Sequence, residues 1–195
     1  MKKIFFATSN KGKVASVNRV LNKFGIEAIQ KEIEIKEIQS DDPKEIASEK
    51  VLSAFKILKK PVIALDAGFF IPSLKGFPGA YVSYVLSKIG SEGILKLVSG
   101  KKRNCEFKEA LAFFASDLKK PVVFEDKVEG KLSFRKKGRR KEYFWSELFY
   151  VFVPKGEKKT LAEMTKKEYL NWSRKVNENS YLVRFAKWYI KNYSK

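Results

Sequence analysis

An apolar segment near the N-terminus runs directly into a turn of hydroxyl, amide and ammonium groups. Residues 2–8 (KKIFFAT) predict a strand, and residues 11–24 predict an amphipathic helix. The turn between them holds Thr8, Ser9, Asn10 and Lys13, whose side chains are hydrogen-bond donors or cations. Because the first N–H groups of a helix are unpaired and carry partial positive charge, such a turn favours a bound anion such as phosphate. The alternative is a plain helix cap with solvated lysines.

Two further segments combine charged residues with strong turn signals. Residues 64–81 (ALDAGFFIPSLKGFPGAY) begin as the end of a buried-looking strand at 61–65, reach Asp66 and continue as a loop rich in Gly and Pro. Residues 160–165 (TLAEMT) precede a predicted helix that carries Ser173, Arg174 and Lys175. A basic helix face is usually only solvated, so these three residues carry little weight by themselves.

In this order and spacing, the three segments resemble the inosine triphosphate pyrophosphatase family along nearly the whole chain. The family patterns are T-x-N-x-x-K near the N-terminus, D-[ST]-G/C-L…L-x-G-x-P-G-x-Y in the middle and T-[FY]-A-E-M…S-H-R near the end. The resemblance implies a hydrolase of nucleotide metabolism, a nucleoside-triphosphate diphosphatase. Its expected substrates are non-canonical purine nucleoside triphosphates, which it would split into monophosphate and pyrophosphate.

The resemblance assigns the phosphate contacts to two segments. Thr8, Asn10 and Lys13 match T-x-N-x-x-K, with Ser9 between them. Lys50 matches a family lysine on the helix that follows an acidic loop, and it shares a helix face with Ala54. Lys13 and Lys50 are therefore expected to neutralise the triphosphate, and with Asp66 they form the predicted catalytic set.

The resemblance also implies a Mg²⁺ cofactor held by Glu37 and Asp66. Asp66 matches the family aspartate that is a metal ligand or activates water, and Glu37 matches the acidic residue before the second helix. Family members commonly carry a second carboxylate directly before that aspartate, where this chain has Leu65. The alternatives are an Asx-type turn at Asp66 and a solvated strand end at Glu37.

The part of the family pattern that contacts the base is rewritten in this chain. Ser173, Arg174 and Lys175 replace S-H-R, and Tyr169 stands where the family has a lysine. The family's aromatic-Asp-Pro segment aligns near residues 147–150, where the aspartate and proline are absent. An alternative function is therefore a diverged, non-catalytic family member that binds nucleotide or nucleic acid.

Composition restricts the available chemistry. The 195 residues include no histidine and one cysteine, Cys105, which excludes Ser-His-Asp and Cys-His catalysis, histidine zinc sites and an intramolecular disulfide. We expect Cys105 to be structural, because no histidine can activate its thiol. Carboxylates, lysines, hydroxyls and a hard metal such as Mg²⁺ remain.

The net charge of +19 implies anionic partners. Part of the charge density is typical of a thermophile surface, with abundant Lys and Glu and only two Gln, although that does not explain the positive sign. Residues 135–141 (RKKGRRK) predict a basic hairpin tip. The tip is either a solvated turn or a contact for nucleic acid, and we expect weak, salt-sensitive binding without sequence preference.

The length and the order of the expected elements predict one domain, residues 1–195, of mixed α/β class in two lobes around a central cleft. The resemblance implies the same architecture, with a mixed elongated sheet and flanking helices. Expected strands cover 2–8, 26–38, 61–65, 107–116, 122–134 and 143–153, and expected helices cover 11–24, 43–58, 78–89, 91–98, 165–176 and 179–193. Thr160 and Glu163 have the spacing of a capping box. No apolar run approaches the roughly 20 residues that cross a bilayer, so we expect a cytoplasmic protein without membrane contact. The resemblance implies a homodimer.

Overall fold

The computed structural model describes residues 1–36, 38–142, 144 and 146–193. The chain divides into two compact units, each made of segments that are distant in sequence. Unit 1 comprises Met1–Asp66, Glu109–Asp126 and Val176–Lys195, and unit 2 comprises Ala67–Lys108 and Lys127–Lys175. The predicted cleft between two lobes stays a prediction.

The strands form one mixed sheet, which confirms the predicted fold class of sheet with flanking helices. The order of six strands is β2-β1-β3-β5-β6-β7, and β4 pairs with β3. The strands are β1 Lys2–Ala7, β2 Ile26–Lys31, β3 Val62–Phe70, β4 Pro78–Gly79, β5 Asn104–Phe114, β6 Val122–Leu132 and β7 Phe152–Pro154. β1 runs parallel to β2 and β3, whereas β3–β4 and β6–β7 are antiparallel.

The helices begin at residues suited to that position. They are α1 Lys11–Leu21, α2 Pro43–Leu58, α3 Val82–Leu97, α4 Lys166–Asn177 and α5 Tyr181–Tyr193, with 3₁₀ turns η1 Asn22–Phe24, η2 Pro72–Leu74 and η3 Glu147–Tyr150. Asn10 and Asp42 accept backbone hydrogen bonds at the starts of α1 and α2. None of the helices in the described part of the chain combines the length and apolar character that a membrane span needs.

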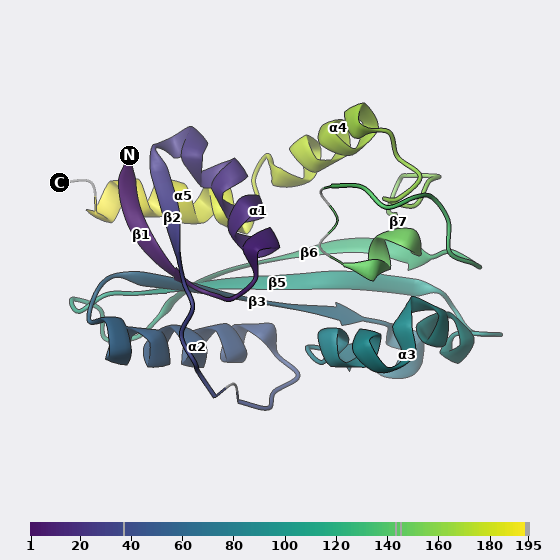
Figure 1. The fold of residues 1–195 in the computed structure, drawn as a ribbon, viewed down its shortest axis with the longest axis horizontal. Coiled ribbons are helices and arrows are strands. Elements are labelled where there is room, and N and C mark those ends of the chain that lie inside the picture. Colours follow the sequence, from purple (N-terminus) through teal and green to yellow (C-terminus); the bar gives the residue numbers. More distant parts are fainter. Residues whose placement is uncertain (37, 143, 145, 194–195) are drawn as a thin grey trace. The chain divides into compact units, whose positions relative to one another are not determined.

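In unit 1, helices cover both faces of the parallel strands (Figure 1). α2 covers one face, where its Ala47, Val51 and Ala54 pack with alanines and valines of the sheet. α1 and α5 contact each other on the opposite face. Because side chains alternate along a strand, neighbouring residues of β3 and β5 point toward α2 and toward α1 and α5 in turn.

Unit 2 has an aromatic core. The rings of Phe69, Phe107 and Phe152 meet at centroid distances of 4.8 to 6.1 Å. Gly68 is required beside them, since an added Cβ would lie 2.6 Å from the Phe70 ring and 2.9 Å from the carbonyl oxygen of Gly79. The Gly/Pro-rich segment is therefore packed against β3.

The structure corrects three of the expected strands. The strand predicted at 26–38 ends at Lys31, because only residues 26–31 pair with β1. The strand predicted at 61–65 continues to Phe70, because Phe69 and Phe70 pair with β4. In place of a strand at 143–153, the described residues form η3 and the short β7, while Tyr143 and Trp145 lie outside the described residues.

The helix break predicted at Gly90 is confirmed. α3 is interrupted there by a φ of 62°, which favours glycine. Beyond the break, Ser91 donates its N–H and its hydroxyl to the Glu147 carboxylate at 3.3 and 3.1 Å. The helix predicted to begin at residue 78 begins only at Val82, because Pro78 and Gly79 form β4.

Candidate functional site

The turn after β1 is built by its own side chains. Asn10 N–H donates to Thr8 Oγ1 at 3.1 Å, and Lys13 N–H donates to Asn10 Oδ1 at 3.1 Å. The second bond caps α1, and both bonds fix the turn where the sequence predicts a phosphate site. Ser9 and Asn10 are exposed and Thr8 is half-buried, so the turn faces solvent.

Lys13 joins this turn to the strand that carries Asp66. Its Nζ donates to the carbonyl oxygen of Leu65 at 3.3 Å. Leu65 directly precedes Asp66, so the first turn of α1 and the Asp66 segment of β3 meet within unit 1. The structure thus brings together the first and second of the three sequence segments.

Asp66 lies inside a strand and is 8% exposed. The expected position at the start of a loop and the alternative Asx-type turn are both wrong, because β3 continues past Asp66 to pair with β4. By strand alternation Asp66 shares the face of Val62 and Ala64, which pack with α2. Burying a carboxylate in a strand costs desolvation free energy, and carboxylates buried at such a cost are often found at functional sites.

Lys50 is half-buried on α2 in the same unit as Lys13 and Asp66. It lies one residue before the buried Val51 and four before the buried Ala54. Glu37 lies outside the described residues. In the described part of the chain, no group of three Asp, Glu, Cys or His side chains is arranged to hold a metal ion.

The residues Ser173, Arg174 and Lys175 lie on α4, with Arg174 and Lys175 exposed and Ser173 half-buried. They belong to unit 2, so their placement relative to the phosphate turn stays a prediction. Tyr169, on the same helix, is buried and packs against Phe149 and Trp172 at ring distances of 6.3 and 5.8 Å.

Residues 147–150 are a structural element in this chain. Glu147 accepts from Ser91 and forms an ion pair with Lys136. Burial alone would raise the pKa of Glu147, but hydrogen bonds from Lys136 and Ser91 bring the pKa below its ordinary value. The carboxylate is therefore charged at neutral pH and stabilises the second half of α3.

The basic segment 135–141 is a loop rather than the expected hairpin tip, because no strand of the described residues follows it before β7. Lys137 N–H donates to the carbonyl of Tyr150 at 2.9 Å, and its Nζ lies 3.8 Å from Glu163. Gly138 packs against the backbone of Ala162 so closely that a side chain would collide. The loop is thus fixed to the 160–164 turn.

That turn has the predicted capping box. Thr160 N–H donates to Glu163 Oε2 at 2.9 Å, and Glu163 N–H donates to Thr160 Oγ1 at 3.2 Å. Leu161 and Met164 of this turn are buried in the core of unit 2. Cys105 is also buried, and burial raises the pKa of its thiol, so its structural role is confirmed.

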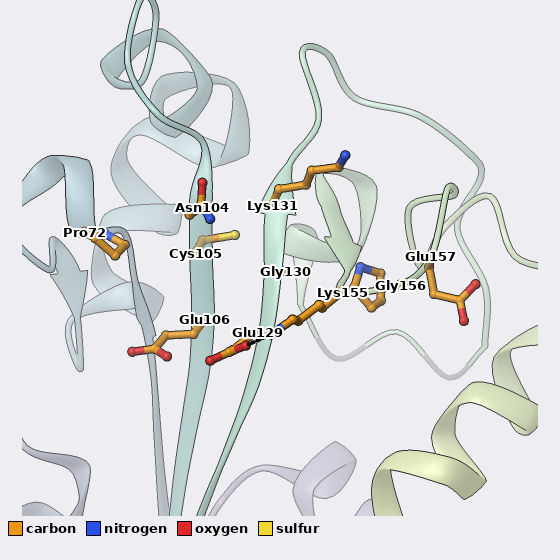
Figure 2. A pocket seen from close by; sticks show the side chains of 11 residues that line it. Pro72, Asn104, Cys105, Glu106, Glu129, Gly130, Lys131, Lys155, Gly156 and Glu157 are labelled. Atoms are coloured by element: carbon orange, nitrogen blue, oxygen red, sulfur yellow. Dashed lines mark hydrogen bonds and ion pairs between the residues drawn. The ribbon is translucent and has the colours of Figure 1, made fainter.

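Unit 2 contains a pocket of about 480 Å³ beside β5, β6 and the turn after β7 (Figure 2). Two of its acidic side chains are held in ion pairs: the lining Lys155 and the nearby Lys127 lie 2.7 and 2.8 Å from Glu129, and Lys127 lies 3.6 Å from Glu106. None of the predicted site residues lines it. Glutamates outnumber lysines in its lining, so the charge of this pocket does not favour a triphosphate.

Sequence reasoning missed an interacting group on β5, β6 and α5 of unit 1. Glu109 accepts a hydrogen bond from the Tyr181 hydroxyl, and the positive charge of Lys13 favours its ionised form. Asp126 accepts from Tyr181 N–H at 2.6 Å and from Arg184 Nη2 at 3.2 Å. The available signal was a glutamate directly before the apolar run 110–115, because a charge at that position in a strand needs partners.

Comparison with known proteins supports the motif assignment. The model of the Ham1 family matches residues 4–177. A dITP/XTP pyrophosphatase of Methanopyrus kandleri is 36% identical over 191 residues, 97% of this chain and 97% of that protein. A dITP/XTP pyrophosphatase of Pyrococcus horikoshii is 40% identical over 167 residues, 85% of this chain and 87% of that protein.

The chain belongs to the Ham1 family. The resemblance to inosine triphosphate pyrophosphatases is thereby confirmed. The structure of a HAM1 protein from Coxiella burnetii covers 98% of this chain and 100% of its own with a TM-score of 0.81 at 20% identity. At that identity the likeness shows the Ham1 fold, and the roles of individual residues rest on the geometry above.

Proposed function

We propose that this Ham1 protein is a nucleoside-triphosphate pyrophosphatase that acts on non-canonical purine nucleotides such as dITP and XTP. The relatives named dITP/XTP pyrophosphatase, aligned over nearly the whole chain, support the hydrolase activity and the substrate class. The observation that carries the proposal is the bond from Lys13 Nζ to the carbonyl of Leu65. This bond joins an anion-binding turn to a buried carboxylate, the two parts that splitting a triphosphate requires.

In this proposal the turn after β1 binds the phosphates. Thr8, Ser9 and Asn10 donate to phosphate oxygens, and Lys13 and Lys50 neutralise their charge. The carboxamide oxygen of Asn10 already accepts from Lys13 N–H, so its NH₂ group is the part that would contact phosphate. Lys13 is the residue best placed to stabilise negative charge that develops on the departing pyrophosphate.

Asp66 orients the attacking water and accepts its proton while the water oxygen bonds to the α-phosphorus. The bond from that phosphorus to the bridging oxygen breaks, and pyrophosphate leaves. Asp66 and Glu37 are the proposed ligands of Mg²⁺. Hard carboxylate oxygens suit this ion, which proteins usually bind through one or two carboxylates together with substrate phosphates. When bound, the ion supplies charge neutralisation and Lewis acidity.

Ser173, Arg174 and Lys175 are the proposed contacts to the base. An arginine can donate to the 6-oxo group of inosine or xanthosine, as a histidine would. We also propose a cytoplasmic homodimer with one functional domain over residues 1–195. The high Lys and Glu content supports a thermophilic source.

Weak binding of nucleic acid is a further part of the proposal. The loop 135–141 uses Lys136 and Lys137 in internal ion pairs, whereas Arg139 and Arg140 are exposed. Nearby, Phe134 is 87% exposed and the Arg103 guanidinium lies 4.7 Å from its ring centroid. An exposed ring among cations can stack on a base, but nothing there reads sequence.

The second candidate function is nucleotide binding without turnover, which Leu65 favours because it stands where the family pattern has a second carboxylate. One experiment separates the two. Pyrophosphate release is measured for dITP, XTP, ATP and GTP, each with Mg²⁺ and with EDTA. The enzyme proposal expects Mg²⁺-dependent release that is fastest for dITP and XTP, whereas saturable binding of dITP without release would favour the second candidate.

A further inference from the structure

One acidic side chain interrupts the apolar stretch of β5 in unit 1. Glu109 precedes Ala110, Leu111, Ala112 and Phe113, all of which are buried. Ala110 and Ala112 pack on the α2 side, so Glu109 points to the face covered by α1 and α5. A carboxylate in this environment is costly, and burial is the main reason why the pKa of Glu109 is raised.

The groups that face Glu109 come from three elements. The charge of Lys13 on α1 and a hydrogen bond from the Tyr181 hydroxyl on α5 favour its ionised form, whereas the charge of Asp126 on β6 opposes it. Burial and the neighbouring carboxylates raise the pKa of Tyr181 well above its ordinary value. The Tyr181 hydroxyl therefore stays protonated and donates a hydrogen bond to Glu109.

Tyr181 is itself fixed. Its N–H donates to Asp126 Oδ2 at 2.6 Å, and Arg184 Nη2 donates to Asp126 Oδ1 at 3.2 Å. Arg184 also donates to the carbonyl of Glu125 at 2.6 Å. These bonds hold the start of α5 on β6, so the hydroxyl that reaches Glu109 has a defined place.

We propose that Glu109, held by Tyr181, is a positioning residue that fixes the ammonium group of Lys13 for the triphosphate. The inference rests on the proposed function of Lys13. The ammonium group has the Leu65 carbonyl of β3 as one acceptor at 3.3 Å. Glu109 lies on the neighbouring strand β5, on the face that α1 covers, and supplies the opposite charge. Two restraints on a flexible lysine matter because small misplacements of a catalytic charge cost large factors in rate.

A measurement of stability separates positioning from a structural role. A carboxyl with a raised folded-state pKa binds its proton more tightly in the folded than in the unfolded protein, so stability falls as pH rises through that range. Glu109→Gln removes this cost at neutral pH and keeps the side-chain shape. A residue needed only for folding would lose stability on substitution, whereas Glu109 is expected to lose rate and keep or gain stability.

The test compares Glu109→Gln with the control Glu125→Gln, an exposed residue of the same unit. For Glu109→Gln we expect kcat for dITP to fall at least tenfold, KM not to rise and the urea midpoint at pH 7 not to fall. Removing a negative charge near an anion site would by itself tighten substrate binding, so a rise in KM is not expected. Unchanged kcat, or a lower kcat together with a lower urea midpoint, would overturn the proposal.

Two more variants test the route through Lys13 and Tyr181. In a Lys13→Ala background, Glu109→Gln should lower kcat no further, and an equal tenfold effect there would overturn positioning. Tyr181→Phe removes a bond that lowers the pKa of Glu109, so the acid limb of the kcat profile should move to higher pH. The same limb should be absent in Glu109→Gln, and an unmoved limb in both variants would contradict the inference.

A binding measurement separates this inference from the proposed function. If the parent releases no pyrophosphate from any triphosphate, the proposed function fails. Calorimetric titration of the same variants with inorganic pyrophosphate then still measures the coupling between Lys13 and Glu109 in anion binding. Non-additive effects of Lys13→Ala and Glu109→Gln on Kd would support positioning, and additive effects would refute it.

Discussion

Replacing Asp66 by asparagine is the sharpest test of the chemistry in unit 1. The substitution keeps the size of the side chain and removes its charge, so it opens no cavity in β3. Asp66 is 8% exposed and lies next to Leu65, whose carbonyl accepts from Lys13. Any loss of rate can therefore be attributed to the carboxylate, provided that the strand and the Lys13 bond stay in place.

The expected magnitude follows from the burial of this charge. In a site that excludes water, removing one preorganised electrostatic group costs about 2.7–4 kcal/mol of transition-state stabilisation, roughly a hundredfold to a thousandfold in kcat. The free energy of unfolding should change by only about 1 kcal/mol, because shape and packing are kept. Asp66→Asn should therefore remain folded and lose nearly all activity.

The assay is pyrophosphate release from dITP at saturating Mg²⁺, with urea unfolding of the same samples. Asp42→Asn is the matched control: Asp42 is exposed at the start of α2, and asparagine caps a helix as well as aspartate does. The control should keep full activity. If Asp66→Asn retains kcat within threefold of the parent, Asp66 neither binds the metal nor activates water, and the proposed mechanism is wrong.

Three further predictions follow from unit 2. Arg174→Ala should reduce the ratio of kcat/KM for dITP over dATP at least tenfold, because a site that donates to a 6-oxo group discriminates through that bond; an unchanged ratio would exclude Arg174 from base recognition. A hydrogen bond from Lys159 is the main cause that lowers the pKa of Glu168 to about 2. Because this folded-state pKa is depressed, its stabilisation is present above the unfolded pKa and lost as pH falls toward 2, so Glu168→Gln should lower the urea midpoint at pH 6 and not near pH 2. A uniform loss at both pH values would contradict that assignment. Replacing three cations of the basic loop by serine should weaken oligonucleotide binding and flatten its salt dependence, as measured by fluorescence anisotropy between 50 and 500 mM salt, without changing dITP hydrolysis. Parent affinity that persists at 500 mM salt would instead indicate specific recognition. The three substituted residues are Arg139, Arg140 and Lys141.

The family, the fold class and the local ends of several elements could be predicted from the amino-acid sequence. Three motifs in a fixed order identify the Ham1 family without any coordinates. Asn10, Asp42 and the Thr160–Glu163 pair act over two or three residues, so their capping bonds follow from spacing alone. The break at Gly90 was equally local, because it depends on a backbone conformation that glycine adopts easily.

The ends of the long strands and the contacts between distant charged residues depend on the tertiary structure. Phe69 and Phe70 continue β3 because β4 pairs with them, and no local pattern shows that pairing. Lys13 reaches the carbonyl of Leu65 across 52 positions, and Glu109 meets Tyr181 across 72. Such contacts depend on strand order and on which face of the sheet each helix covers. Sequence patterns record burial and local propensity, whereas a buried charge is balanced by whichever partner the fold brings to it.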